Sequence, residues 1–96
     1  MLNIVPFAEE HIDSICEIEN ESFGDPWSKN LFLKLLHNPF AVAYVAVGDG
    51  VLDVPQVLGY LIAHHMFSEI EILNIAVRKS ERNKKIATRL FDKIFD

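Results

Sequence analysis

The stretch of sequence that decides the fold is residues 70–95, IEILNIAVRKSERNKKIATRLFDKIF. Side chains alternate in character from Glu69 to Val77, as they do along a β-strand. From about Asn83 onward, apolar residues recur at every third or fourth position, which is the spacing of an amphipathic helix. A short turn rich in basic residues joins the two segments. The stretch therefore predicts a strand, a polar turn and a helix whose first turn is cationic.

The junction between this strand and this helix is a candidate phosphate site. A helix N-terminus leaves backbone N–H groups without partners inside the helix, and its dipole favours an anion there. Arg82, Lys84 and Lys85 lie at the same point of the sequence and would add positive charge. The alternative is an ordinary strand-to-helix corner with solvated basic side chains. These features alone leave both interpretations open.

The same segment resembles the acetyl-coenzyme A motif of the GNAT superfamily of N-acetyltransferases. In that motif a strand ending in Ile-Ala-Val precedes Arg/Gln-x-x-Gly-x-Gly/Ala at the start of a helix. Arg82, Lys85 and Ala87 occupy the three motif positions, and Lys85 stands where the family has Gly. Because Gly adopts positive φ at little cost and lets the backbone approach a ligand closely, this difference implies weaker or altered coenzyme binding.

Further segments resemble bacterial ribosomal-protein-alanine acetyltransferases, in the order that this group requires; they are residues 17–28, 38–40, 57–60 and 73–77. The resemblance spans most of the chain. It implies an α/β fold with a mixed sheet, namely the N-terminal part of an acyl-CoA N-acyltransferase fold. The implied order of elements is strand, helix, helix, strand, strand, strand and helix.

Local patterns place elements along the rest of the chain. Apolar spacing and composition predict helices over residues 8–23 and 28–37, strands over 40–47 and 57–64, a turn over 48–50, an irregular segment over 51–55 and a bulge at Gly59.

A length of 96 residues, of which 50% are hydrophobic, fits one domain. We expect residues 1–96 to be a single, incomplete domain. The resemblance implies later elements, including a fifth strand with a general-base Glu and a following region with a general-acid Tyr.

Composition argues against several classes of protein. No stretch approaches the roughly 20 apolar residues of a membrane span. The N-terminus lacks the pattern of a secretory signal. We therefore expect a cytoplasmic protein without membrane contact. Cys16 is the only cysteine and lies in an apolar helical pattern, which favours a packed thiol over a nucleophile. No Cys/His group has zinc spacing, and we expect no metal.

Charge is divided unevenly along the chain. Residues 1–77 carry two basic and eleven acidic side chains, for a formal charge of −9, whereas residues 78–96 carry seven basic and three acidic, for +4. This division suits a polyanionic cofactor at the C-terminal part and a cationic substrate near the acidic remainder. Solvated charge on an ordinary surface explains it equally well. We expect no nucleic-acid binding, because the basic residues are few and the aromatic residues near them, Phe91 and Phe95, are expected in the helix core.

The resemblance implies transfer of acetyl from acetyl-CoA to an amine by direct attack. It implies that the strand contacts the acetyl and pantetheine groups and that the turn and helix start bind the pyrophosphate. The implied coenzyme-binding residues are Ile75, Ala76, Val77, Arg82, Asn83, Lys84, Lys85, Ile86, Ala87 and Thr88. Phe23 and Trp27 would bind the acceptor substrate, with Glu19, Glu21 and Asp25 nearby to attract an amine. The alternative for Trp27 is a core anchor at a helix start.

Glu71 is the candidate catalytic base. It precedes Val77 by six residues. Histone-type members of the superfamily carry a strand-borne Glu at this place. Ile70 and Ile72 are expected to desolvate its carboxylate and raise its pKa. Glu69 is expected on the same face. The alternative is a pair of half-exposed strand carboxylates without a catalytic role.

Two classes of function follow. The first is an N-acetyltransferase whose acceptor is the N-terminal α-amine of a protein such as a ribosomal protein. Small amines and lysine side chains stay open as acceptors, because the family's acceptor contacts lie largely in later elements. The second is a catalytically incomplete GNAT-like module that binds coenzyme or another protein. The exposed edge of its last strand would favour a homodimer, because unpaired strand edges recruit strands.

Overall fold

The computed structural model describes residues 2–49 and 55–95. The elements are β1 (Asn3–Pro6), η1 (Glu9–His11), α1 (Ile12–Ser22), α2 (Lys29–Leu36), β2 (Ala41–Asp49), β3 (Pro55–Met66), β4 (Glu69–Val77), η2 (Lys79–Glu81) and α3 (Ile86–Ile94). The two η elements are single turns of 3-10 helix. Apart from these turns, the order is strand, helix, helix, strand, strand, strand and helix, so the expected α/β fold and element order are confirmed.

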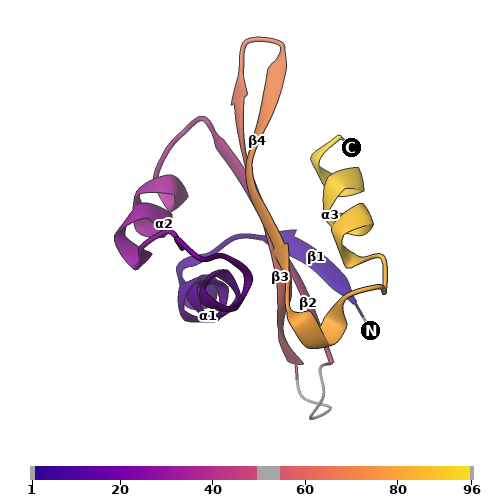
Figure 1. The fold of residues 1–96 in the computed structure, drawn as a ribbon. Coiled ribbons are helices and arrows are strands. Elements are labelled where there is room, and N and C mark those ends of the chain that lie inside the picture. Colours follow the sequence, from indigo (N-terminus) through magenta and orange to yellow (C-terminus); the bar gives the residue numbers. More distant parts are fainter. Residues whose placement is uncertain (1, 50–54, 96) are drawn as a thin grey trace.

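The strands form one sheet in the order β1-β2-β3-β4. Helices α1 and α2 cover one face of this sheet, and α3 covers the other (Figure 1). Each neighbouring pair among the described strands is antiparallel. A mixed sheet was expected, but the sheet formed by the described strands is purely antiparallel. Because β4 ends the order, its outer edge has no strand beside it among residues 2–49 and 55–95.

Each sheet face carries its own apolar cluster. The cluster under α1 and α2 is built on Ile12, Ile15, Ile18, Phe32, Val45, Tyr60 and Ile62, all at most 2% exposed. The cluster under α3 is built on Ala46, Leu58, Leu61, Ala63, Ile86, Leu90 and Ile94, all at most 8% exposed. Residues 60–63 of β3 thus alternate between the two clusters, as the two-residue period of a strand requires.

Two bulges interrupt the strand pairing. In β3, Gly59 pairs with Ala46 and Val57 pairs with Val47, so Leu58 is the extra residue. This bulge lies next to Gly59, where a bulge was expected. In β4, Asn74 pairs with Ile62 and Ile72 pairs with Ala63, so Leu73 is the extra residue. The extra residue reverses the alternation of side chains beyond it. The expectation of unbroken alternation from Glu69 to Val77 is therefore wrong.

The ends of several elements differ from the local predictions. Gly48 and Asp49 belong to β2 rather than to a turn, and β3 already begins at Pro55. The remaining residues of the expected turn and irregular segment, 50–54, lie outside the described residues. The helix expected over residues 8–23 begins as η1 and continues as α1 to Ser22. Helix α2 is capped at its N-terminus by Ser28, whose Oγ accepts the Leu31 N–H at 3.2 Å.

Candidate functional site

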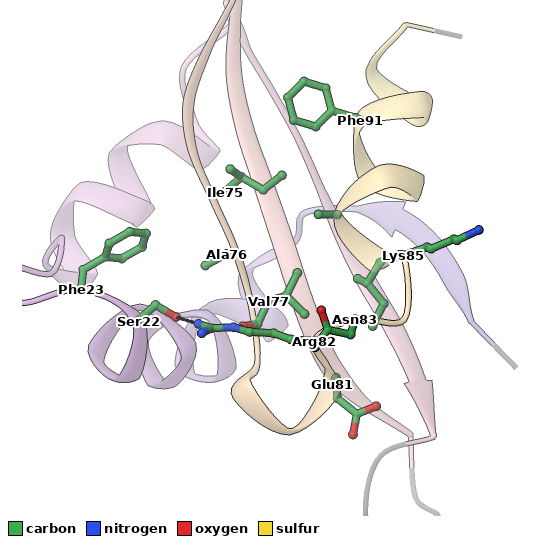
Figure 2. Close-up of a pocket in the computed structure, with 12 residues that line it drawn as sticks. Ser22, Phe23, Ile75, Ala76, Val77, Glu81, Arg82, Asn83, Lys85 and Phe91 are labelled. Carbon is green, nitrogen blue, oxygen red and sulfur yellow. Dashed lines mark hydrogen bonds between the residues drawn. The ribbon is translucent and has the colours of Figure 1, made fainter.

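A pocket of about 590 Å³ lies along the second half of β4, between the C-terminal end of α1 and the start of α3. Its lining residues are Ser22, Phe23, Ile75, Ala76, Val77, Glu81, Arg82, Asn83, Lys85, Ile86, Ala87 and Phe91. Figure 2 shows Ser22 and Phe23 on one side of the strand and Phe91 on the other. The pocket therefore brings together most of the predicted coenzyme-binding residues, but not Lys84 or Thr88.

Backbone groups on the free edge of β4 face this pocket. The Arg78 N–H donates to the Leu58 carbonyl at 2.7 Å, so this pair is a hydrogen-bonded pair of the β3–β4 ladder. Hydrogen-bonded and non-hydrogen-bonded pairs alternate along an antiparallel ladder. The backbone groups of Ile75 and Val77 therefore point away from β3 toward the free edge. The Val77 carbonyl accepts a hydrogen bond from the Arg82 Nε at 3.0 Å. The N–H and carbonyl of Ile75 are available to a ligand.

The turn before α3 exposes a second set of backbone donors. Asn83 and Lys85 have positive φ values of 65° and 62°, and α3 begins only at Ile86 instead of near Asn83. Residues with these φ values cannot continue a right-handed helix, which explains the later start. Within the described part of the chain, the N–H groups of Ile86, Ala87 and Thr88 have no hydrogen-bond acceptor. This is the arrangement of donors that binds an anion at a helix start.

The three basic side chains of the turn have different surroundings. The Arg82 guanidinium spans the pocket, from the Val77 carbonyl to the Ser22 Oγ at 3.3 Å (Figure 2). The Lys84 Nζ lies 3.0 Å from a carboxylate oxygen of Glu81, which is 4% exposed. The Lys85 side chain points away from the Ser22 side of the pocket. Arg82 is thus the basic side chain of the turn that lies across the pocket.

The predicted acceptor residues separate in the structure. Phe23 is 39% exposed and lines the pocket. Trp27 instead packs beside the α1–α2 cluster, with its ring centroid 5.6 Å from that of Phe32. It therefore matches the core-anchor alternative, and it does not line the pocket. Acceptor binding by Phe23 stays a prediction.

Glu71 lies outside this pocket. It is exposed, and it lines a hollow of about 350 Å³ with His64, Glu69 and the turn of the β3–β4 hairpin. Ile70 and Ile72 pack on the α3 side of the sheet, so they do not surround its carboxylate. The expected desolvation of Glu71 is therefore wrong, because neighbours along a strand point to opposite faces. A catalytic role for Glu71 stays a prediction.

A buried polar cluster, which the sequence pattern did not predict, lies beside the pocket. Glu19 is 1% exposed, and its carboxylate accepts hydrogen bonds from the Trp27 N–H at 2.8 Å, the Asn74 Nδ2 at 2.7 Å and the Tyr60 hydroxyl. Glu19 is therefore not the exposed attractant for an amine that we expected. The signal in the sequence was Asn74, the one amide in an otherwise largely apolar strand segment.

Two further titratable groups have displaced pKa values. Burial, followed by the hydrogen bond to Glu19, raises the pKa of Tyr60, so its hydroxyl keeps its proton and donates it to the carboxylate. Burial also raises the pKa of the half-buried Cys16 thiol, and the Asp13 carboxylate raises it further. Because the thiolate is the nucleophilic form, Cys16 fits a packed thiol rather than a reactive one.

The described residues contain neither a helix that could span a membrane nor a metal-binding group of side chains. None of the helices in this part of the chain has the length and apolar character needed to cross a membrane. No group of three or more His, Cys, Asp or Glu side chains in residues 2–49 and 55–95 is placed to hold a metal ion. The cytoplasmic location stays a prediction.

Comparison with known proteins identifies relatives in sequence. The profile described as "Acetyltransferase (GNAT) family" matches residues 12–96. The chain is 36% identical over 83 residues to a protein of Bacillus subtilis (strain 168) that is provisionally named a [ribosomal protein bS18]-alanine N-acetyltransferase. The match covers 85% of this chain and 52% of that protein. The chain thus spans about half the length of this relative.

Solved structures share the fold. The crystal structure of the ribosomal-protein-S18-alanine N-acetyltransferase from Escherichia coli superposes with a TM-score of 0.86 at 18% identity, over 100% of this chain and 58% of that one. Arabidopsis thaliana NAA60 in complex with acetyl-CoA superposes with a TM-score of 0.77 at 14% identity, over 98% of this chain and 65% of that one. At these identities the likeness concerns the fold.

Proposed function

Because the chain belongs to the acetyltransferase (GNAT) family, we propose that it provides the coenzyme-binding part of an N-acetyltransferase that uses acetyl-CoA. The observation that carries this proposal is the pocket in which two sets of free backbone groups meet. One set is the edge of β4 at Ile75, and the other is the start of α3, where Ile86 and Ala87 line the pocket. We further propose that residues 1–96 form one incomplete domain of the family.

The pocket supports a division of roles for an extended thioester ligand. The N–H groups at residues 86–88 and the Arg82 guanidinium would hold the pyrophosphate, since both are donors at the positive end of a helix dipole. The free backbone groups of Ile75 would pair with the amides of the pantetheine arm, as an added strand would. Phe91 and Ile86 would cover its apolar atoms.

The chemistry requires no covalent enzyme intermediate. The acceptor amine loses a proton to a base and attacks the thioester carbonyl. A C–N bond forms, the C–S bond breaks, and the thiolate leaves. A backbone N–H at the strand edge would stabilise the oxyanion of this step. Glu71 stays a candidate base, although it lines a different hollow from Ile75.

We propose the N-terminal α-amine of a protein, such as a ribosomal protein, as the acceptor. The support is the name of the Bacillus subtilis relative. Small amines and lysine side chains are the alternatives. Turnover on an Ala-starting peptide, compared with the same peptide blocked at its N-terminus and carrying an internal Lys, separates them. Acetylation of the blocked peptide alone would contradict an α-amine acceptor.

The second candidate function is a catalytically incomplete module that binds coenzyme or a second copy of itself. The free edge of β4 favours it, because such edges recruit strands. Sedimentation should then show a dimer, and Ile75→Pro should dissociate it. Pro at this position removes an N–H that faces the edge and none that pairs with β3. A monomer at all concentrations would contradict the binding of a second copy.

The experiment that tests the first proposal is a calorimetric titration of the chain with acetyl-CoA and, in parallel, with S-acetylpantetheine. Saturable binding of acetyl-CoA, and much weaker binding of the ligand that lacks the pyrophosphate, is the expected result. Arg82→Ala should weaken binding of acetyl-CoA and leave that of S-acetylpantetheine unchanged. The matched control is Arg89→Ala, which removes an exposed cation of α3 that does not line the pocket. Absence of saturable binding would contradict the proposal.

A further inference from the structure

A buried carboxylate joins the two sides of the pocket without lining it. Glu19 lies on α1, is 1% exposed, and accepts three hydrogen bonds, from the Trp27 N–H, the Asn74 Nδ2 and the Tyr60 hydroxyl. Among the described residues it has no basic partner. A buried carboxylate is costly unless its oxygens are fully hydrogen-bonded, so the three donors must be held in place for this residue to be tolerated.

The Asn74 contact lies next to the bulge of β4. Leu73 is the extra residue of this bulge, and Asn74 is the first residue after it to pair with β3. The bulge decides which residues of the following strand present their backbone to the free edge. Loss of the bulge would slip the pairing of the following residues by one position and so exchange Ile75 and Ala76 in this respect. The 2.7 Å bond from Asn74 to Glu19 opposes such a shift.

The same residue holds the opposite side of the pocket. The backbone carbonyl of Glu19 accepts the Phe23 N–H at 3.1 Å, which ends α1. Its carboxylate accepts the Trp27 N–H at 2.8 Å, which fixes the segment that follows. The position of Phe23 is therefore fixed by hydrogen bonds to Glu19, which also binds Asn74. Glu19 couples the Phe23 side of the pocket to the strand edge at Ile75.

We propose that Glu19 and Asn74 are a positioning pair that sets the distance between the Phe23 side of the pocket and the free backbone groups of Ile75. This inference rests on the proposed function, because it assigns the acetyl thioester to Ile75 and the acceptor amine to the Phe23 side. Neither member of the pair touches the ligand. Their effect is to hold two reactants in register, which is the source of rate that proximity supplies.

Tyr60 supplies a matched control. Its hydroxyl donates to the same Glu19 oxygen, Oε1, as Asn74 does, but it comes from β3, away from the bulge. Tyr60→Phe and Asn74→Ala each remove one donor from this oxygen. We expect both variants to lose about 1–2 kcal/mol of stability, measured by denaturant unfolding. A purely structural role for the cluster predicts that they also affect ligand binding equally.

The positioning role predicts a difference between the two variants. At a temperature where both are folded, Asn74→Ala should weaken acetyl-CoA binding about ten-fold, whereas Tyr60→Phe should stay within about two-fold of the parent chain. If Asn74→Ala does not fold, Asn74→Leu, of similar volume, takes its place. Parent-like affinity in the Asn74 variant, or equal losses in both variants, would overturn the proposal.

A readout without ligand separates this inference from the proposed function. Amide hydrogen exchange at residues 74 and 76 of the ligand-free chain should accelerate strongly in the Asn74 variant and little in Tyr60→Phe. If the parent chain does not bind acetyl-CoA, the proposed function fails while the exchange comparison still decides whether the pair holds the strand. Equal exchange in the two variants overturns the positioning pair whatever the binding result.

Discussion

The two faces of the sheet are held by different kinds of interaction. Under α1 and α2, an apolar cluster packs beside Glu19. The Glu19 carboxylate accepts hydrogen bonds from β3, β4 and the segment after α1. Under α3, on the opposite face of the sheet (Figure 1), the buried side chains of the cluster are all apolar, and Leu90 among them is fully buried. The α1–α2 face therefore adds directed hydrogen bonds to its apolar packing, whereas the cluster under α3 relies on packing without a preferred direction.

This difference shows how one strand can serve both as a wall of the core and as an edge of the pocket. Apolar packing tolerates changes of shape that conserve volume, whereas a buried hydrogen-bond cluster tolerates almost none. The bulge of β4 decides the direction of the free backbone groups of this strand. It is tied to the α1–α2 face by the hydrogen bond from Asn74 to Glu19. We infer that Glu19 and Asn74 on the α1–α2 face fix the direction of the free backbone groups of β4, whereas the buried apolar side chains under α3 contribute mainly stability.

The largest expected effect comes from Glu19→Gln compared with Leu90→Met, two changes that nearly conserve volume at fully buried positions. The amide of Gln turns one acceptor into a donor, which leaves a buried donor without a partner. We expect Glu19→Gln to lower the free energy of unfolding by about 2–3 kcal/mol and Leu90→Met to lower it by less than about 1.5 kcal/mol. Denaturant unfolding measures both, and equal losses would break the comparison.

An intermediate effect is expected from Gly59→Ala, which probes how tightly the α3 face is packed. An added Cβ would meet the Ala76 carbonyl oxygen at 2.9 Å and the Ile86 Cγ2 at 3.4 Å. Since the first of these is backbone in the sheet, it cannot move away freely, and we expect a loss of about 1–2 kcal/mol. Gly24→Ala is the control, because a Cβ there meets no atom within 4 Å. A Gly59→Ala variant as stable as this control would show that the β4 backbone at Ala76 can move away from the added Cβ.

The smallest expected effect is a gain of stability in Lys85→Gly. Lys85 has φ 62° at the N-cap of α3, a conformation that costs a residue with a Cβ roughly 1–2 kcal/mol. Gly removes this cost but loses more backbone entropy on folding, so a net gain of about 0.5 kcal/mol is expected in thermal unfolding. Lys85→Ala removes the same charge and keeps the strained φ, so it should not stabilise. A gain of the same size in both variants would assign the effect to charge.

Much of the site was predictable because it depends on neighbours in sequence. Residues 75–77 and 82–87 follow one another along a strand and a turn, and the strand-to-helix pattern alone indicated that free N–H groups would gather there. The surroundings of Lys84 and Lys85 were not predictable. Whether a basic side chain at such a turn faces a ligand, pairs with Glu81 or points away depends on side-chain contacts that a linear pattern does not contain.

The amino-acid sequence by itself determined the order of the elements, the family and the strand-to-helix junction at which we place the coenzyme. These features rest on apolar periodicity and motifs that act over a few residues. Only the tertiary structure decided that Glu19 is buried, that β4 carries a bulge at Leu73 and that Glu71 lies outside the pocket. The physical reason is separation along the chain. Glu19 finds its partners Tyr60 and Asn74 at distances of 41 and 55 residues, and only folding brings them together.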